Sequence, residues 1–250
     1  MRHEEIQRMY PNHFFTARRG KGSVRKLAGK IDVLVFFVND SQSRWTELAK
    51  QRYRKTQKAA MQTLVRMARS KGVQLQMRNA YIDATSSMEC YPANYNTWSK
   101  EIVAKYGRPA VAAFQDHYEV SNRCDEAPII FVLNKSFRSG AISLDRDCSV
   151  QGEMSIISSD FTQHAIIHEL LHQFGAMDLY YPREVKNLVE RMNYESVMAT
   201  AGCMHFDSLT CYLIGWTDEI DFPTVQILER TKHYTREYMT AVIKSEYAGR

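Results

Sequence analysis

The chain has 250 residues, of which 44% are hydrophobic and 24% charged, and its formal net charge is +5. These values are ordinary for one or two globular domains, and 11 glycines and 6 prolines are too few for a fibrous or largely disordered chain. The longest apolar run, Val33–Val38, is far shorter than the roughly 18 residues that a membrane span needs, so no membrane span is expected.

The beginning of the chain and its cysteines predict a reducing compartment. Residues Met1–Glu5 are polar and lack the apolar stretch of a secretory signal, which predicts a cytoplasmic location. Non-classical export as an effector or toxin is the alternative. The 5 cysteines are odd in number and form no CxxC pair, so we expect free thiols.

Basic residues are concentrated in two stretches of the N-terminal third. One cluster lies between Arg18 and Lys26, and residues 1–29 are expected to form a flexible basic arm. In the other, between Arg44 and Lys71, basic residues far outnumber acidic ones. Such clusters are typical of solvated faces, and the alternative is contact with an acidic partner. No zinc-finger spacing or aromatic RNA-binding signature accompanies them, so nucleic acid is not an expected partner.

The first strong elements are a strand, a long helix and a second strand. Lys30–Asn39 is dense in β-branched and aromatic residues, which predicts a buried strand. Asp40 and Ser41 can then cap a helix over residues 43–70, where no proline or glycine interrupts an apolar face. Val73–Ile82 begins with alternating apolar and polar residues, as a strand with one solvated face does.

Shorter elements follow. We expect helices over Trp98–Tyr106 and Pro109–His117, and strands over Ile129–Leu133, Ala141–Leu144 and Glu153–Ser158. Asp160 is a good N-cap for a helix over about residues 161–174. A loop-rich stretch follows, and then an amphipathic helix is expected over Asp207–Ile214, stopped at Gly215. The tail from Phe222 mixes helix and strand signals. There is no internal repeat, low-complexity segment or linker, which favours one α+β domain.

The segment that carries chemistry is HELLH, at residues 168–172. His168 and His172 are four residues apart, so on a helix they lie on one face, about one turn apart. Two imidazoles at that spacing can both reach one zinc ion at about 2.0–2.1 Å. Glu169 lies too far round the helix to share the metal easily, but it can hydrogen-bond a metal-bound water. The pattern predicts a zinc site with Glu169 as general base.

A third ligand can come from the turn after this helix. Gly175 can adopt a left-handed conformation, which ends the helix and can bring Asp178 to the same metal. Two histidines and one carboxylate leave a fourth position open for water, as in catalytic zinc sites. The alternative is a glutamate on a later helix, as in thermolysin-like enzymes, and Glu190 and Glu195 are suitably spaced. His164, one turn before the motif, is expected to lie in the groove or at the surface rather than bind the metal.

The eleven residues HELLHQFGAMD resemble the HExxHxxGxxH/D signature of the metzincin zinc peptidases, in the Asp variant of the snapalysin-type small neutral proteases. In this clan a methionine turn forms a hydrophobic floor under the metal, and Met198, in Ser-Val-Met, matches that methionine. The resemblance implies an α+β fold: a single zincin-like domain with a twisted mixed sheet, a long backing helix, a metal-binding active-site helix and a smaller C-terminal subdomain.

The resemblance also divides the chain. It implies an arm at residues 1–29 and a metallopeptidase domain at 30–250, with an upper subdomain at about 30–175 and a lower one at about 176–250.

One position departs from the clan. Several metzincins carry a tyrosine two residues after the turn methionine, where it can support the metal or the transition state, but here that position is Thr200. The candidates to supply this support from elsewhere are Tyr180, Tyr181, Tyr194 and His205.

The resemblance implies a zinc-dependent endopeptidase that binds one catalytic Zn²⁺ through His168, His172 and Asp178. Glu169 would act as general base on a metal-activated water, and the partner would be a peptide or protein substrate. The alternative is a zinc-binding interaction module without protease activity, which docks an acidic partner through its basic helix.

Overall fold

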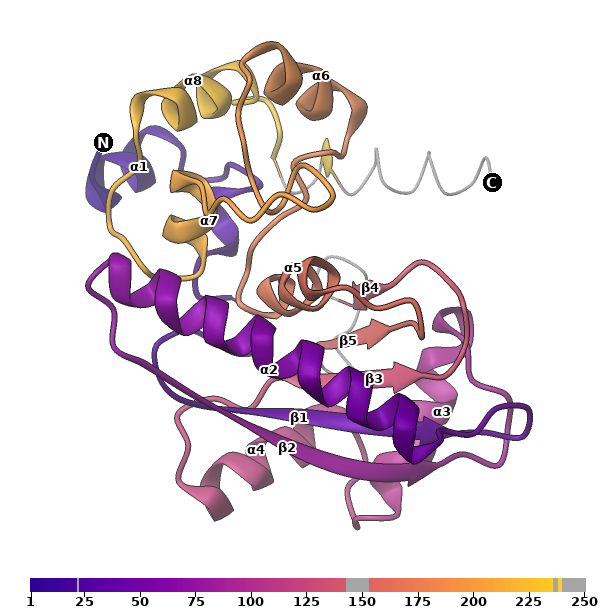
Figure 1. Cartoon of the computed structure of the whole chain (residues 1–250). Helices are drawn as coiled ribbons and strands as arrows, with labels where there is room; N and C mark the ends of the chain where they lie inside the picture. Colours follow the sequence, from indigo (N-terminus) through magenta and orange to yellow (C-terminus); the bar gives the residue numbers. More distant parts are fainter. Residues whose placement is uncertain (22, 143–152, 236–237, 240–250) are drawn as a thin grey trace.

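The computed structural model describes residues 1–21, 23–142, 153–235 and 238–239, and its centre is a five-stranded sheet (Figure 1). The strands are β1 (Gly29–Asn39), β2 (Leu75–Thr85), β3 (Ile129–Leu133), β4 (Gly140–Ile142) and β5 (Met154–Ile157). Their order is β2-β1-β3-β5-β4; all neighbours pair in parallel except β4, which is antiparallel to β5 at one edge. This confirms a mixed α and β protein with a mixed sheet.

The sheet lies between two layers of helices (Figure 1). One face is covered by α2 (Glu47–Ser70) and α5 (Gln163–Gln173), and the other by α3 (Tyr95–Ala104) and α4 (Val111–Asn122). In β1, Val33, Val35 and Phe37 belong to the first core and Leu34, Phe36 and Val38 to the second. Successive side chains of a strand point to opposite faces, so a strand buried on both faces has the continuous apolar sequence seen here.

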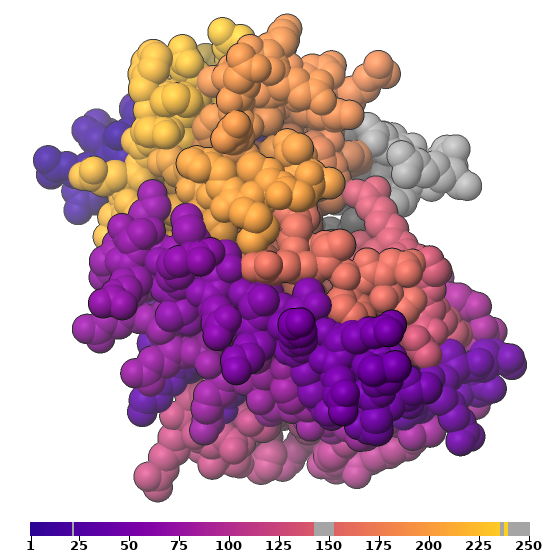
Figure 2. All heavy atoms as spheres, viewed as in Figure 1, coloured from indigo at the N-terminus to yellow at the C-terminus, as the bar shows by residue number. Residues whose placement is uncertain are grey.

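The chain after α5 forms a second group of helices on the far side of α5 from the sheet (Figure 1). It contains α6 (Arg183–Arg191), α7 (Ser208–Leu213) and α8 (Phe222–Arg230), and α1 (His3–Met9) lies beside them. In Figure 2 the orange and yellow atoms of this group lie above the purple atoms of α2, and coral atoms lie between them at the centre of the view. The helix α6 replaces the loop-rich stretch expected there, because its buried residues Val185, Leu188 and Val189 form a single short stripe.

The prediction that residues 1–29 form a flexible arm is wrong. Ile6, Phe15 and Leu27 are fully buried in the core that includes the C-terminal helices. The Met1 amino group donates a hydrogen bond to the Ile220 carbonyl oxygen at 2.8 Å. The charges in this segment concealed an apolar pattern, and two of its arginines form ion pairs, Arg18 with Glu153 at 3.4 Å and Arg19 with Asp218.

Two helices begin later than expected. Helix α2 is capped by Thr46, whereas Asp40 accepts hydrogen bonds from the backbone of Gln42 and Ser43 and so closes a turn after β1. Helix α5 is capped by Thr162 and not by Asp160. Carboxylates near a helix start also stabilise turns, and here the threonines at the true N-cap positions accept the helix N–H groups.

The other expected helices and strands are confirmed with boundaries shifted by a few residues. The helices α1 and α8 were not predicted, and two 3-10 helices lie at Thr16–Arg18 and Pro92–Asn94. Residues 143 and 144 of the expected strand Ala141–Leu144 lie outside the described residues. Among the residues that the structure describes, no helix is long and apolar enough to span a bilayer. The cysteines Cys90, Cys124, Cys203 and Cys211 are free thiols, and Cys148 lies outside the described residues.

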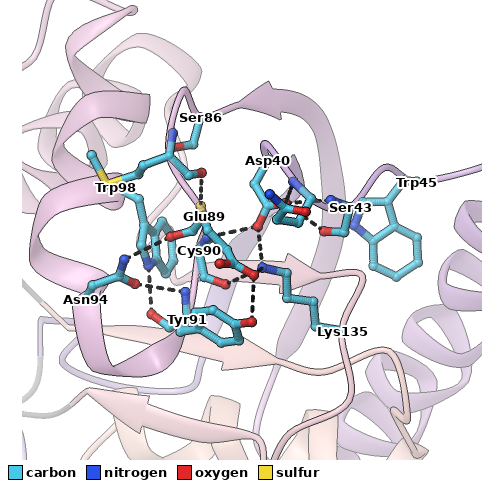
Figure 3. Close-up of polar contacts among 12 residues, drawn as sticks. Asp40, Ser43, Trp45, Ser86, Glu89, Cys90, Tyr91, Asn94, Trp98 and Lys135 are labelled. Atoms are coloured by element: carbon cyan, nitrogen blue, oxygen red, sulfur yellow. Dashed lines mark hydrogen bonds and ion pairs between the residues drawn. The ribbon is translucent and has the colours of Figure 1, made fainter.

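A buried ion pair joins the loops that follow β1, β2 and β3 (Figure 3). Lys135 Nζ lies 2.8 Å from Asp40 Oδ2 and 3.1 Å from Glu89 Oε1. The same Asp40 oxygen accepts a hydrogen bond from the Cys90 N–H at 2.8 Å, and Lys135 Nζ lies 4.1 Å from the centre of the Tyr91 ring. These contacts tie together the carboxyl ends of three neighbouring strands.

Candidate metal centre

Helix α5 carries the two histidines and the glutamate of the motif on its buried side. Thr162 caps the helix by accepting the Ala165 N–H at 3.0 Å, so the helical spacing of the motif is set from its first turn. His168, Glu169 and His172 are each at most 9% exposed. Their candidate ligand atoms all lie within 4.8 Å of one another, and the three form a group that could hold a metal ion.

The outer nitrogen of each imidazole is tied to a backbone carbonyl. His168 Nδ1 lies 3.0 Å from the Val197 carbonyl oxygen, and His172 Nδ1 lies 2.9 Å from that of Ala176. A carbonyl oxygen only accepts hydrogen bonds, so each Nδ1 carries a proton. In the neutral ring this leaves the lone pair of Nε2 free to bind a metal.

The turn after α5 brings the predicted carboxylate to these nitrogens. Gly175 has φ +91°, and its N–H donates to the His172 carbonyl oxygen at 3.0 Å, which ends the helix. Asp178 Oδ1 then lies 3.1 Å from Nε2 of His168 and 3.1 Å from Nε2 of His172. Two ligands of a tetrahedral zinc ion, each about 2.0–2.1 Å from it, lie about 3.3 Å apart. The observed spacing fits such an ion.

Asp178 Oδ1 is buried and has no hydrogen-bond partner of acceptable geometry among the described residues. A buried carboxylate oxygen facing two nitrogen lone pairs is unfavourable unless a cation lies between them. The residues therefore fit a divalent metal, and a proton is the competing occupant. Burial lowers the pKa of His172 but the charge of Asp178 raises it, and the net result is an increase to about 9. Metal binding would displace this proton.

Glu169 belongs to the same buried group, with a carboxylate oxygen within 4.8 Å of the candidate ligand nitrogens of His168 and His172. Burial raises the pKa of its carboxyl group, while the neighbouring imidazoles oppose this increase. A buried carboxylate with a raised pKa suits a group that accepts a proton and later returns it.

The turn that contains Met198 packs directly against the motif. Met198 is fully buried, and its carbonyl oxygen accepts the Leu179 N–H at 2.9 Å, next to Asp178. Ser196 Oγ accepts the Met198 N–H at 2.9 Å, which fixes the turn. The Val197 carbonyl oxygen in this turn is the acceptor for His168, so the turn orients a proposed ligand.

Of the four residues that could support the transition state, the structure places one at the cavity beside the motif. The Tyr180 ring stacks on His168 with ring centres 5.9 Å apart. The Tyr194 hydroxyl instead donates to Asp207 at 2.9 Å, His205 is exposed, and Tyr181 is half-buried. Of the four, Tyr180 alone lines the cavity beside the motif in the described part of the chain.

The alternative ligands do not join the site. Glu190 and Glu195 are both exposed, and Glu190 lies 3.7 Å from Lys186 on α6. His164 Nε2 lies 3.1 Å from the Val197 carbonyl oxygen, so this nitrogen is occupied by a hydrogen bond. Thus, in the part of the chain that the structure describes, Asp178 is the carboxylate outside α5 that lies beside both histidines.

A cavity of about 850 Å³ lies alongside the motif. Its wall includes His168, Glu169 and Tyr180, and on the opposite side the turn residues Val197 and Thr200. Arg138, just before β4, also lines this cavity, with its guanidinium carbon 5.4 Å from the centre of the Tyr180 ring. The sequence contains no local signal for Arg138, which lies far upstream of the motif.

Comparisons with known proteins gave no match: no family model, no curated protein and no solved structure resembles this chain closely enough to be detected.

Proposed function

We propose that the protein is a zinc-dependent endopeptidase of metzincin type. The observation that carries the proposal is the position of Asp178 Oδ1, which is buried without a hydrogen bond 3.1 Å from two imidazole nitrogens. The other nitrogen of each imidazole is already engaged by a carbonyl oxygen. This is the donor set of a catalytic zinc site with one open position.

A bound zinc ion would polarise the scissile carbonyl group and lower the pKa of a water at the open position toward about 7. Glu169 would accept a proton from the attacking water and deliver it to the leaving amine. The Tyr180 hydroxyl, at the cavity wall beside His168, would donate a hydrogen bond to the substrate oxygen as negative charge develops there. The cavity would hold the peptide next to these groups.

The competing function is a zinc-holding module that docks an acidic partner through α2. Its support is the exposed basic side chains on this helix, among them Arg52, Lys55 and Lys58. The buried Glu169 and the adjoining cavity favour the enzyme, because a structural metal site needs neither a general base nor an open side.

The test is metal content and peptide cleavage in the wild type and in Glu169→Gln. We expect about one zinc per chain in both proteins, measured by plasma mass spectrometry. Cleavage of a peptide library by the wild type should fall by about 100-fold or more in Glu169→Gln, because general base catalysis contributes about 10²–10⁴-fold. Glu190→Gln, at an exposed carboxylate of α6, is the control and should cleave normally.

Two results would overturn the proposal. A purified, folded protein that binds no divalent metal would remove the site itself. Zinc bound at one ion per chain with no cleavage of any peptide would favour the docking module.

A further inference from the structure

A positively charged side chain, Arg138, lines the cavity beside the motif and has no role in the proposed chemistry. Arg138 lies between β3 and β4, and its side chain is exposed to the cavity that Glu169 and Tyr180 also line. Its guanidinium carbon lies over the Tyr180 ring, 5.4 Å from the ring centre. Arg138 is therefore positioned at the wall where a substrate would lie.

Within the described residues, Arg138 has no carboxylate partner within ion-pair distance. The other charged groups of the cavity wall are already engaged or have another role. Asp160 accepts a hydrogen bond from the Ser136 hydroxyl, and Lys186 lies 3.7 Å from Glu190. Glu169 is the proposed general base. Among the described residues that line this cavity, Arg138 is thus a cation without an ion-pair partner, whose charge a substrate could neutralise.

The backbone on both sides of Arg138 is held in place. The Asn134 side chain donates to the Arg44 carbonyl oxygen at 2.7 Å, and Ser139 Oγ accepts the Ser158 N–H at 3.1 Å. Lys135 forms the buried ion pair with Asp40 that joins three loops (Figure 3). Less conformational entropy is lost when a ligand binds a group that is already ordered.

We propose that Arg138 is a specificity-determining residue and that the preferred substrates carry a carboxylate side chain, aspartate or glutamate, beside the scissile bond. The inference rests on the proposed peptidase function. A guanidinium group binds a carboxylate through two parallel hydrogen bonds, which gives both attraction and orientation. The aromatic ring of Tyr180 supports one face of the guanidinium group and limits its rotation.

The test uses peptides that the protein cleaves only when zinc is present. The peptides are compared in matched pairs, in which one member has glutamate and the other glutamine at the same position flanking the cleaved bond. For the zinc-loaded wild type we expect kcat/KM to be about tenfold higher for the glutamate peptide at one of these positions, an estimate reduced for the exposure of Arg138. In Arg138→Gln the ratio should fall to about one, and in Arg138→Glu a lysine peptide should be preferred.

Two controls separate recognition by Arg138 from other effects. Arg8→Gln, at an exposed position of α1, makes the same change in net charge and should keep the tenfold ratio. The ratio should decrease with added salt, because solvent screens an exposed charge pair. Substrates with an amidated C-terminus should show the same ratio, which distinguishes a side-chain carboxylate from a terminal one.

The outcomes are distinct. Equal cleavage of both peptides by the wild type, or an unchanged preference in Arg138→Gln, would overturn the assignment of Arg138. A preference that disappears with the amidated substrates would assign Arg138 to the terminal carboxylate and would also contradict the inference. No cleavage of any peptide by the zinc-loaded wild type would instead refute the proposed peptidase function.

Discussion

At the scale of single residues, the proposed metal site depends on the charge of Asp178. Burial raises the pKa of its carboxyl group, but the positive charge of the two neighbouring imidazoles outweighs this and holds the pKa well below the usual range. A group that stays ionised while buried is suited to bind a cation at any physiological pH.

Asp178→Asn keeps the shape of this side chain and removes its charge. We expect zinc affinity to fall by at least about 100-fold, since changes in groups that only support a ligand already cost about 10–100-fold. The measurement is a competition titration with a chromophoric chelator. Glu195→Gln, at an exposed position, should bind zinc as the wild type does. An unchanged affinity in Asp178→Asn would show that the third ligand is another residue.

The sequence predicted that Asp178 could reach the histidines, but it did not predict what surrounds Asp178. The spacing from Gly175 made Asp178 reachable, because the turn is local. The placement of Tyr180 against His168 and the contact of Arg138 with Tyr180 depend on how β4 and the turn meet, which no local pattern encodes.

At the scale of elements, the turn after α5 determines whether the carboxylate meets the histidines. Gly175 has φ +91°, a conformation that favours glycine. A Cβ atom there would lie 2.8 Å from the Arg18 carbonyl oxygen, which is backbone and cannot easily move. The N-terminal segment is thus packed against the turn that positions Asp178, the proposed metal ligand.

Gly175→Ala should therefore destabilise the protein through both backbone strain and a steric clash. We expect the free energy of unfolding in urea to fall by about 2–4 kcal/mol and zinc to bind more weakly. Gly72→Ala is a matched control, because Gly72 has φ +73° but a Cβ atom added there would meet no neighbouring group within 4 Å. It should lose only about 1 kcal/mol. Equal losses in the two variants would show that the clash with Arg18 is unimportant.

At the scale of the whole molecule, the N-terminal segment belongs to the second group of helices. Phe15 is fully buried in the same core as Leu213 and Tyr234, which come from the other end of the chain. This packing joins the N-terminal segment to α7 and to the residues that follow α8.

Phe15→Ala should lower the free energy of unfolding by about 3–5 kcal/mol, because it leaves a large cavity in the core. Met9→Ala, at a side chain that is 50% exposed in the same segment, should change it by less than about 0.5 kcal/mol. Urea unfolding followed by circular dichroism measures both. Similar small changes would mean that residues 1–28 contribute little to stability.

Because of the ion pair between Asp40 and Lys135, we expect the free energy of unfolding to depend on pH in the acidic range. Burial raises the pKa of Asp40, but hydrogen bonds from Lys135 and three backbone N–H groups outweigh this and lower it from 3.8 to about 2. The unfolded chain therefore binds a proton more readily than the folded one. The contribution of this carboxylate to stability is complete above about pH 4 and is lost as the pH falls toward about 2.

Asp40→Asn should thus flatten the loss of stability between about pH 4 and pH 2 and lower stability at pH 7 by about 2 kcal/mol. Urea unfolding at about pH 7, 4 and 3 measures this dependence. Asp116→Asn, on the exposed side of α4, is the control and should follow the wild-type pH profile. A profile of Asp40→Asn that parallels the wild type would show that other carboxylates account for the acid sensitivity.

Features that depend on neighbouring residues could be predicted from the sequence. Residues 129–133 and 30–39 predict buried strands because their apolar runs are continuous, and the four-residue spacing of His168 and His172 places both on one helix face. Contacts between residues far apart in the chain became visible only in the folded structure. The docking of Phe15, the ion pair of Lys135 and the position of Arg138 join segments far apart in the chain, and no local periodicity reports such contacts.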